Sequence, residues 1–309
     1  MNRFIAAAAA YLWLGLAVGT RALCADTIPI PNGSFESPVT AFVNINIDAW
    51  QKAPKPDWYA EDDVFLWTQL TGLFLNTPPA SADHIDNCDG QQAIWLFAVP
   101  EVALFQDYDS TDWLHTTPLH AFDARFELGK SYTLTVGLIG GGGNMVEGAS
   151  VELSLYYRDG ASNQVVVAAT NVTHSTTLFP TTTRLLDFQA QLPTVQAGDP
   201  WAGQHIGVRL RSSIVDTNLV GGYWDVDDVR LTSTLVPVLQ AAAWTNGHFQ
   251  FQLRSEPGLK LELLATSDLA LALTNWTSLG TLTNFSGETV FTNSAAGANV
   301  RYYRARQLP

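Results

Sequence analysis

Short runs of apolar and β-branched residues, separated by clusters of Gly, Asn, Asp and Pro, are the feature that most constrains this fold. The clearest runs cover residues 131–139, 150–157, 164–170, 183–192, 205–212 and 222–232. Several of them alternate apolar and polar positions with a period of two, as half-buried antiparallel strands do. Convincing amphipathic helices are absent from the sequence. The pattern predicts an all-β protein whose main part is an antiparallel β-sandwich of the jelly-roll kind.

Two turn segments sharpen this prediction. The polar segment Arg158–Asn163 joins two runs and predicts a hairpin turn in which Asp159 and Gly160 supply the positive-φ positions. The glycines at 140–143 also lie between two predicted strands. Because they do not connect a strand to a helix, they lack the context of a phosphate-binding loop, and they predict a hairpin tip.

Three segments are expected along the chain. Residues 1–25 resemble an export signal with a short positive start, an apolar stretch and small residues at its end. The apolar stretch of about 14 residues is shorter than the roughly 20 that span a bilayer. Residues 26–234 are expected to form the jelly roll and residues 237–309 a smaller β-sandwich. We therefore expect a secreted or cell-surface protein without a membrane span.

Charge and cysteine content exclude several functional classes. The 309 residues carry 16 Lys and Arg against 29 Asp and Glu, a net charge of −13, so nucleic acids and anionic membranes are poor partners. Only Cys88 remains after residue 25, which leaves no intramolecular disulfide. Zinc-site spacing of histidines, a nucleophile elbow and the paired acids of jelly-roll glycosidases are all absent. The oligomeric state is not fixed by these features.

Acidic residues stand at both ends of the predicted jelly roll. Its first part contains Asn32-Gly33-Ser34-Phe35-Glu36, and its last part contains Asp227-Asp228-Val229-Arg230-Leu231. Together the two motifs resemble carbohydrate-binding-module-like, or galactose-binding-like, jelly rolls. The resemblance implies that the end strands lie together and hold a structural calcium, with Glu36 and either Asp227 or Asp228 as ligands. Calcium prefers such hard oxygen ligands.

The period of two suggests which acid points inward. It places Asp225 and Asp227 on the face shared by Val229 and Leu231, which favours Asp227 as the calcium ligand. A buried carboxylate in that position requires a cation or strong hydrogen-bond donors. The alternative is that these acids cap turns or face solvent.

A closer resemblance extends over most of residues 29–232. It is carried by five short segments in a fixed order, at 32–36, 87–93, 105–107, 129–134 and 227–231. They resemble exported bacterial proteins of the group that includes the calcium-dependent Stig cyclases of indole alkaloid biosynthesis. In those cyclases a carboxylate in an apolar, aromatic-lined pocket donates a proton to the substrate. The resemblance implies Asp225 as the candidate acid, with Trp95, Tyr108 and Trp224 as pocket walls, and core packing is the alternative for these aromatics.

The densest aromatic and charged segment covers residues 48–67, and its prolines predict a loop. Exposed rings beside carboxylates suit a sugar-binding face, because the C–H faces of pyranoses stack on them. The candidate ligand-binding residues are Trp50, Trp58, Tyr59 and Trp67. The alternative is a satellite hydrophobic cluster under a long loop.

The last part of the chain resembles the small fibronectin-type-III-like or Ig-like β modules that end many exported proteins of the verrucomicrobial type. The resemblance is carried by Leu261–Leu269, Asn275–Thr277 and Arg301–Arg306. It implies a spacer or surface-association unit without chemistry of its own.

These observations favour a secreted, non-catalytic, calcium-stabilised protein that binds carbohydrate or another extracellular small-molecule ligand. Two alternatives remain open. One is a calcium-dependent cyclase or isomerase-like enzyme that uses an acidic residue in an aromatic pocket. The other is a structural cell-surface protein.

Overall fold

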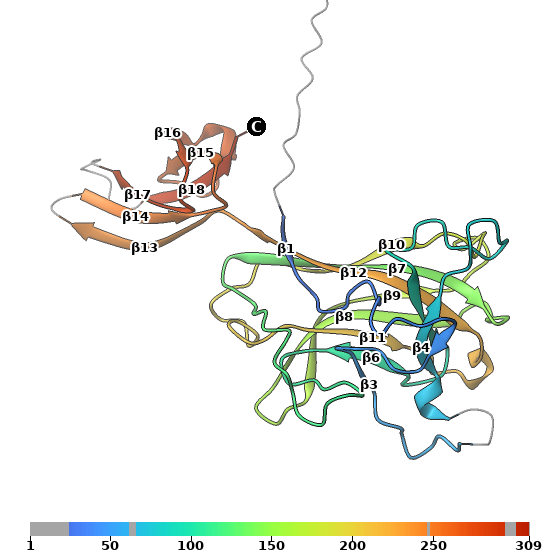
Figure 1. Ribbon diagram of the computed structural model, residues 1–309. Helices are drawn as coiled ribbons and strands as arrows, with labels where there is room; N and C mark the ends of the chain where they lie inside the picture. Colours follow the sequence, from blue (N-terminus) through green and yellow to red (C-terminus); the bar gives the residue numbers. More distant parts are fainter. Residues whose placement is uncertain (1–24, 62–65, 246–247, 294–300, 309) are drawn as a thin grey trace, which may run out of the picture. The chain divides into compact units, whose positions relative to one another are not determined.

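The computed structural model describes residues 25–61, 66–245, 248–293 and 301–308 (Figure 1). The expected export signal at 1–25 falls, except for its last residue, outside the described residues. The chain divides into two compact units, one covering Ala25–Val236 and the other beginning at Pro237. No helix in the described part of the chain is long and apolar enough to cross a membrane.

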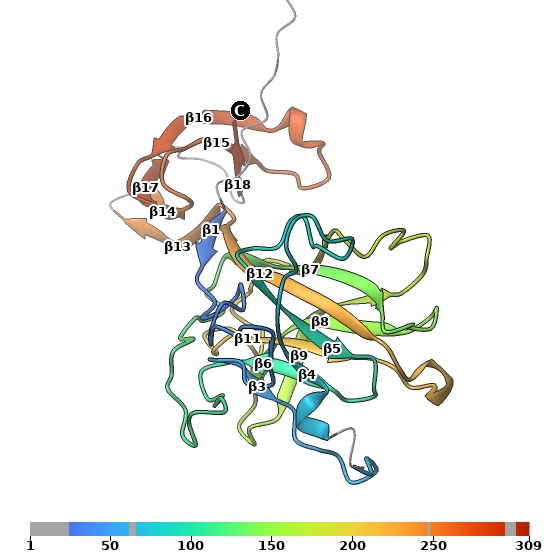
Figure 2. The ribbon, with the colours of Figure 1, turned by 45° about the vertical axis from the view of Figure 1, so that its right-hand side comes forward.

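The larger unit is a jelly roll of two antiparallel sheets (Figures 1 and 2). The seven-stranded sheet runs in the order β10 (Leu186–Leu192), β7 (Lys130–Gly142), β12 (Tyr223–Leu235), β5 (Gln92–Phe97), β4 (Thr71–Leu75) and β2 (Val43–Asn44), with β1 (Asp26–Ile28) paired to β12. The five-stranded sheet runs in the order β3 (Gln51–Lys52), β6 (Ala103–Gln106), β11 (Gly207–Ser212), β8 (Ser150–Arg158) and β9 (Gln164–Thr173). The all-β jelly-roll prediction is confirmed.

The main core of this unit is built from the alternating residues of the two sheets. Leu134, Val136 and Leu138 of β7 are fully buried, as are Leu153 and Leu155 of β8. Burial of each such side chain contributes about 1.5–3 kcal/mol to folding. The alternation that predicted the strands therefore also forms the core, and it leaves the intervening side chains on the outer faces of the sheets.

A β-bulge changes which residues of β12 face the core. The side chains of Trp224, Val226, Val229 and Leu231 are all buried there. The strand register shifts between Asp227 and Arg230, and Asp228 has a φ of 54°. Because the bulge inserts an extra residue, the period of two fails at this point. Asp225 and Asp227 consequently lie on the outer face, which corrects the expectation that they share a face with Val229 and Leu231.

The turn between β8 and β9 also differs in detail from the prediction. The positive φ belongs to Ser162, at 65°, and not to Asp159 or Gly160. The Asp159 carboxylate accepts hydrogen bonds from the backbone N–H groups of Ala161 and Asn163, at 2.9 and 2.8 Å. The aspartate therefore stabilises the turn through its side chain.

The smaller unit consists, in its described part, of two three-stranded antiparallel sheets. One runs β13 (Val238–Thr245), β14 (His248–Arg254), β17 (Glu288–Asn293), and the other runs β16 (Thr277–Asn284), β15 (Leu259–Thr266), β18 (Tyr302–Gln307). Its core contains Phe251, Leu253, Leu261 and Leu263. Short 3₁₀ turns occur at η1 (Trp67–Gln69) and η2 (Thr217–Leu219) in the larger unit and at η3 (Leu273–Asn275) here. The fibronectin-type-III-like assignment and the export of the protein stay predictions.

Candidate active site

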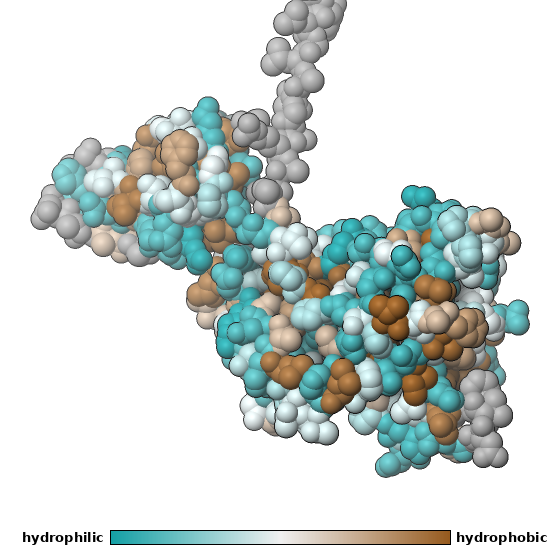
Figure 3. Space-filling view, in the orientation of Figure 1, coloured by the Kyte–Doolittle hydropathy of each residue, from teal (hydrophilic) through white to brown (hydrophobic). Residues whose placement is uncertain are grey.

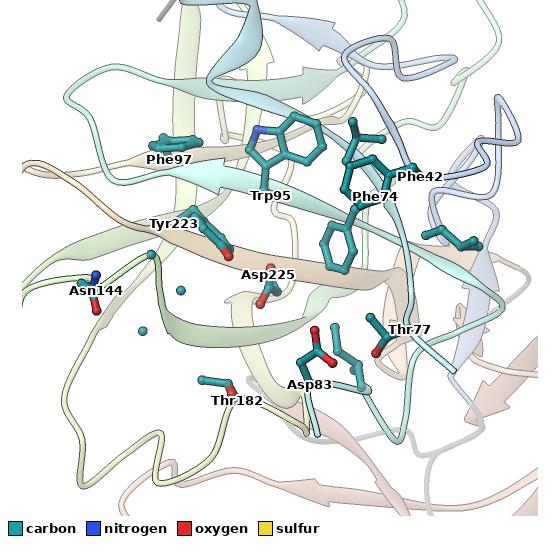
Figure 4. A pocket seen from close by; sticks show the side chains of 16 residues that line it. Phe42, Phe74, Thr77, Asp83, Trp95, Phe97, Asn144, Thr182, Tyr223 and Asp225 are labelled. Carbon is teal, nitrogen blue, oxygen red and sulfur yellow. The ribbon is translucent and has the colours of Figure 1, made fainter. Parts of the chain in front are cut away.

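A cavity of about 720 Å³ lies on the outer face of the seven-stranded sheet (Figure 4). Its floor comes from β5 and β12, one side from β4 and the opposite side from the end of β7, and loops complete the rim. The lining residues are Phe42, Val43, Phe74, Leu75, Thr77, Asp83, Ile85, Trp95, Phe97, Gly141, Gly142, Gly143, Asn144, Thr182, Tyr223 and Asp225. Elements from distant parts of the chain therefore build one site.

Strand register sets the aromatic floor of the cavity. Asp225 lies opposite Trp95 in the ladder between β12 and β5, and Tyr223 lies opposite Phe97. The rings of Phe97 and Tyr223 are 5.7 Å apart between centroids. The Trp95 indole N–H donates to the backbone oxygen of Gln69 at 2.9 Å, which fixes the orientation of its ring. Side chains on the non-core face of neighbouring strands are thus brought together.

Glycines give these rings their room. A Cβ at Gly72 would come within 2.5 Å of the Trp95 ring, and one at Gly142 within 2.4 Å of the Tyr223 ring. Larger residues at either position would have to displace an aromatic wall. Of the four glycines expected to form a hairpin tip, those at 140–142 end β7, and those at 141–143 line the cavity.

Asp225 is the acidic group on the floor of the cavity. In the part of the chain that the structure describes, no hydrogen bond or ion pair reaches its carboxyl group. Burial alone raises the pKa of Asp225 from its usual 3.8 to about 7. Burial, followed by the charges of Asp225 and Asp83, also raises the pKa of the neighbouring Tyr223. A carboxyl group in these surroundings holds a proton at a pH where an ordinary aspartate has lost it.

Of the three aromatic walls expected for Asp225, the structure places one in the cavity. Trp95 lines it, but Trp224 is fully buried in the core between the sheets. Tyr108 lies outside the lining and stacks between His120 and His205, with ring centroids 4.0 and 3.9 Å away. Four further aromatic residues line the cavity that were not expected from the sequence: Phe42, Phe74, Phe97 and Tyr223. Only Tyr223 carried a usable signal, because it precedes Asp225 by two positions on the same strand.

The aromatic segment at 48–67 is largely folded into the protein, contrary to the expectation of an exposed binding face. Trp50 and Trp67 are 2% and 6% exposed. Their indole N–H groups donate to the backbone oxygens of Asn32 and Ala53, at 3.0 and 2.8 Å. Tyr59 packs edge-on against Trp67 at 5.0 Å. Trp58 alone of the four candidates is exposed, so the rings pack mainly against each other and the core.

The predicted calcium ligands meet at the turn after Cys88. Glu36 Oε1 accepts hydrogen bonds from the N–H groups of Gln91 and Gln92, at 2.8 and 2.7 Å. Asp227 Oδ2 accepts from the N–H of Asp89 at 2.6 Å, while its Oδ1 is buried without a partner. Burial raises the pKa of Asp227 to about 7.

These contacts show which of Glu36, Asp227 and Asp228 has an oxygen available to bind a cation. Asp228 Oδ1 pairs with the Arg230 guanidinium at 3.0 Å, so that oxygen is already occupied. The unpartnered oxygen of Asp227, with Glu36 bound to the same turn, fits a cation better than Asp228 does. Within the described ranges, no group of three or more His, Cys, Asp or Glu side chains is arranged to hold a metal ion. A calcium ion here would therefore need backbone oxygens as further ligands.

The family model described as HpiC1 cyclase matches residues 26–232, and the chain belongs to this HpiC1-like family. The resemblance to the Stig cyclase group is thereby confirmed. No curated protein matches the sequence.

Two solved structures of a cyclase support the fold. A cyclase from Fischerella sp. TAU is 21% identical, with a TM-score of 0.50 over 69% of this chain and 100% of that chain. The same kind of cyclase in complex with 4-(1H-indol-3-yl)butan-2-one is 22% identical, with the same TM-score and coverage. The CBM22-1 xylan-binding domain of Paenibacillus barcinonensis Xyn10C is 11% identical, with a TM-score of 0.32 over 62% of this chain and 88% of that chain.

Family membership corrects the functional expectation. We expected a non-catalytic carbohydrate-binding protein, and this was wrong, because the matching family is one of cyclases. The alternative, an acidic residue in an aromatic pocket, agrees with the family better. The burial of Trp50 and Trp67 removes two of the rings on which the binding interpretation depended.

Proposed function

We propose that this protein is an acid-catalysed cyclase for a small, largely apolar substrate, with the Asp225 carboxyl group as the proton donor. The observation that carries the proposal is the place of Asp225, without a hydrogen-bonding partner, on the floor of an aromatic cavity. Polar groups of a folded core are normally paired. An acid left unpaired beside a cavity of this size is available to a substrate.

The proton can move at neutral pH. With its pKa raised to about 7, a substantial fraction of Asp225 is protonated in neutral solution. The carboxyl group gives this proton to one carbon of a substrate C=C bond, whose π electron pair forms the new C–H bond. The neighbouring carbon becomes cationic, and a second C=C bond of the substrate supplies the electron pair for the ring-closing C–C bond. Loss of a proton from the product cation balances the reaction, which is an isomerisation overall.

The walls of the cavity suit the charge that develops in such a reaction. The rings of Trp95, Phe97 and Tyr223 form the floor, and the ring of Phe74 lies at its side (Figure 4). Aromatic faces attract a cation within about 6 Å, by roughly 0.5–2 kcal/mol for each contact. Rings also exclude water, which would otherwise capture the cation. The cavity volume of about 720 Å³ is in the range of small-molecule sites.

An aromatic substrate is the class we favour. The related Fischerella cyclase was solved in complex with an indole ketone, and the lining of this cavity offers the rings of Trp95 and Tyr223 for stacking with a flat ring system. Indole is a useful probe, because a proton added at its C3 gives a cation, and loss of a proton from the same carbon regenerates indole.

Deuterium exchange at indole C3 tests this role directly. In D₂O the wild-type protein should exchange this hydrogen faster than protein-free buffer, and Asp225→Asn should slow the protein-dependent rate by at least about 100-fold, as loss of a general acid does. NMR integration of the C3 proton gives the rate. Asp57→Asn is the matched control, because Asp57 is exposed and lies outside the cavity. Equal rates in wild type and Asp225→Asn, or saturable indole binding without exchange, would contradict the proposal.

We further propose a structural calcium held by Glu36, Asp227 and backbone oxygens. Support comes from the unpartnered buried oxygen of Asp227 and from the contact of both acids with the turn at 89–92. The ion would supply no step of the reaction. It would neutralise a buried carboxylate and hold the segment that carries Glu36 against β12.

Thermal unfolding with calcium and with a chelator tests this site. Calcium at about 100 times its Kd stabilises a folded protein by about 2.7 kcal/mol, which raises the unfolding midpoint by several degrees. We expect this rise in wild type and in Asp228→Asn, and its loss in Asp227→Asn. A midpoint independent of calcium in the wild-type protein would disprove the site.

A further inference from the structure

The charged groups around the cavity have one sign only. Among its lining residues, Asp83 and Asp225 are acidic, and Lys, Arg and His are absent from that lining. The remaining polar side chains are the neutral Thr77, Asn144 and Thr182, together with the Tyr223 hydroxyl. An anionic substrate would therefore meet repulsion and no compensating donor of positive charge.

Asp83 differs from Asp225 in its position. It comes from the loop between β4 and β5 and is exposed, whereas Asp225 lies on the strand floor. Figure 4 shows the Asp83 carboxylate facing the cavity between Thr77 and Thr182. Within the described residues, no ion pair joins Asp83 to a basic side chain. The neighbouring His84 ring instead contacts the backbone oxygen of Thr77 at 2.5 Å.

Two exposed apolar side chains form another part of the rim. Phe42 is 76% exposed and Val43 51% exposed, and both line the cavity. On the face drawn in Figure 3, several hydrophobic residues gather over the region that Figure 1 labels β4. A single carboxylate on a rim whose other side chains carry no charge discriminates between ligands by charge more than by shape.

We propose that the substrate is a small aromatic amine, whose ammonium group pairs with Asp83 while its ring lies over the aromatic floor near Asp225. The proposal rests on the cavity being the substrate site of the proposed cyclase. A protonated amine can donate a charge-assisted hydrogen bond to the Asp83 carboxylate. Its positive charge can also interact with the face of the Trp95 or Tyr223 ring. The overall net charge of −13 further favours the approach of cations.

The arrangement also keeps the two acids apart in function. The Asp83 carboxylate is the partner of the ammonium group, so that most of the positive charge of the ligand is compensated at the rim. Asp225 then meets the neutral ring of the substrate, to which a proton can be transferred. Asp83 is thus a specificity-determining residue and not the proton donor.

Calorimetric binding of tryptamine and tryptophol tests this inference, because the two differ only in an ammonium against a hydroxyl group. Both titrations use full-length Asp225→Asn protein, in which Asp83 is the only acid left in the lining. We expect tryptamine to bind about two- to fivefold more tightly at pH 7 and low salt, the range of an exposed ion pair. Replacing Asp83 by Asn in this background should bring the ratio of the two dissociation constants to about one.

Asp86→Asn in the same background is the matched control. Asp86 is an exposed acid of the same loop and does not line the cavity, so the preference for tryptamine should persist. Equal binding of the two probes before Asp83 is changed, absence of saturable binding of either, or the same loss of preference in both variants would overturn the inference.

The outcome is distinguishable from that of the exchange experiment. Binding selectivity depends on Asp83, and C3 exchange depends on Asp225. Exchange that requires Asp225 without selectivity for the amine would leave the cyclase proposal standing alone. Selectivity through Asp83 without exchange would retain the amine site and remove the cyclase.

Discussion

Two groups of aromatic residues in this protein differ in their packing: one group is largely packed together, and the other lines a cavity. Trp50, Trp58, Tyr59 and Trp67 lie within one short segment, and two of the four are buried while Tyr59 packs on Trp67. Trp95, Phe97 and Tyr223 come from two strands and leave a cavity between their rings. Rings that are near in sequence can reach each other and fill their own space. Rings held by strand backbones on the outer face of a sheet are kept at fixed separations, and space for a ligand remains.

The largest expected effect on stability is that of replacing Trp50, a buried ring of the 48–67 segment. Its ring is 2% exposed and packs against Phe35 with centroids 5.4 Å apart. Trp50→Ala should lower the free energy of unfolding by about 4 kcal/mol, because it leaves a large cavity and removes the indole hydrogen bond to the backbone oxygen of Asn32. Urea unfolding followed by circular dichroism measures this loss. A change below about 1 kcal/mol would show that the ring is not a core residue.

Asp225 should show the opposite behaviour, since its removal stabilises the fold. The folded-state pKa of about 7 lies above the value of an unfolded aspartate, so ionisation of Asp225 destabilises the folded protein. Asp225→Asn should match wild type near pH 4, gain stability as the pH rises toward 7, and keep a constant gain above it. A shift of this size corresponds to about 4 kcal/mol, and we expect about half because the cavity is open to water.

Urea unfolding of both proteins at several pH values measures this gain. Asp57→Asn, at an exposed position, should follow the wild-type curve throughout. A variant that is equally stable relative to wild type at pH 4 and pH 8 would show that Asp225 ionises normally in the folded protein.

Trp58 is the exposed aromatic residue of the 48–67 segment, and its replacement should have the smallest effect on stability. It is 51% exposed, and its indole N–H donates to the Glu101 carboxylate at 3.0 Å. Trp58→Ala should change stability by less than about 0.5–1 kcal/mol, as an exposed contact does. It should leave tryptamine binding unchanged, since Trp58 does not line the cavity. A several-fold loss of tryptamine binding in this variant would place the ligand at the 48–67 segment instead.

Much of the fold could be read from local pattern. The alternation in residues 131–139 and 150–157 marked β7 and β8, because an antiparallel strand with one buried face requires it. Strands β4, β5 and β6 were not predicted from this alternation. They are four to six residues long, and buried residues dominate β6 and most of β4 and β5, which removes the alternation.

The candidate site was only partly predictable. Asp225 and Trp95 were implied by the resemblance to the Stig cyclases, and both line the cavity. Phe42, Phe74 and Asp83 could not be predicted as lining residues, because their loop and strand positions carry no pattern that marks them as neighbours of Asp225. The glycine run at 140–143 was visible, but its purpose depends on the Tyr223 ring, which lies on another strand.

The sequence by itself determined the class of fold, the acidic character of the chain and the residues able to donate a proton, since these follow from local periodicity and residue chemistry. Tertiary structure decided which of these residues meet. The bulge at Asp228 turns Asp225 and Asp227 to the outer face of the sheet, against the period of two. Strand pairing then sets Asp225 opposite Trp95, more than a hundred residues away in the chain. Contacts at such separation depend on long-range strand register, which no local stretch of sequence specifies.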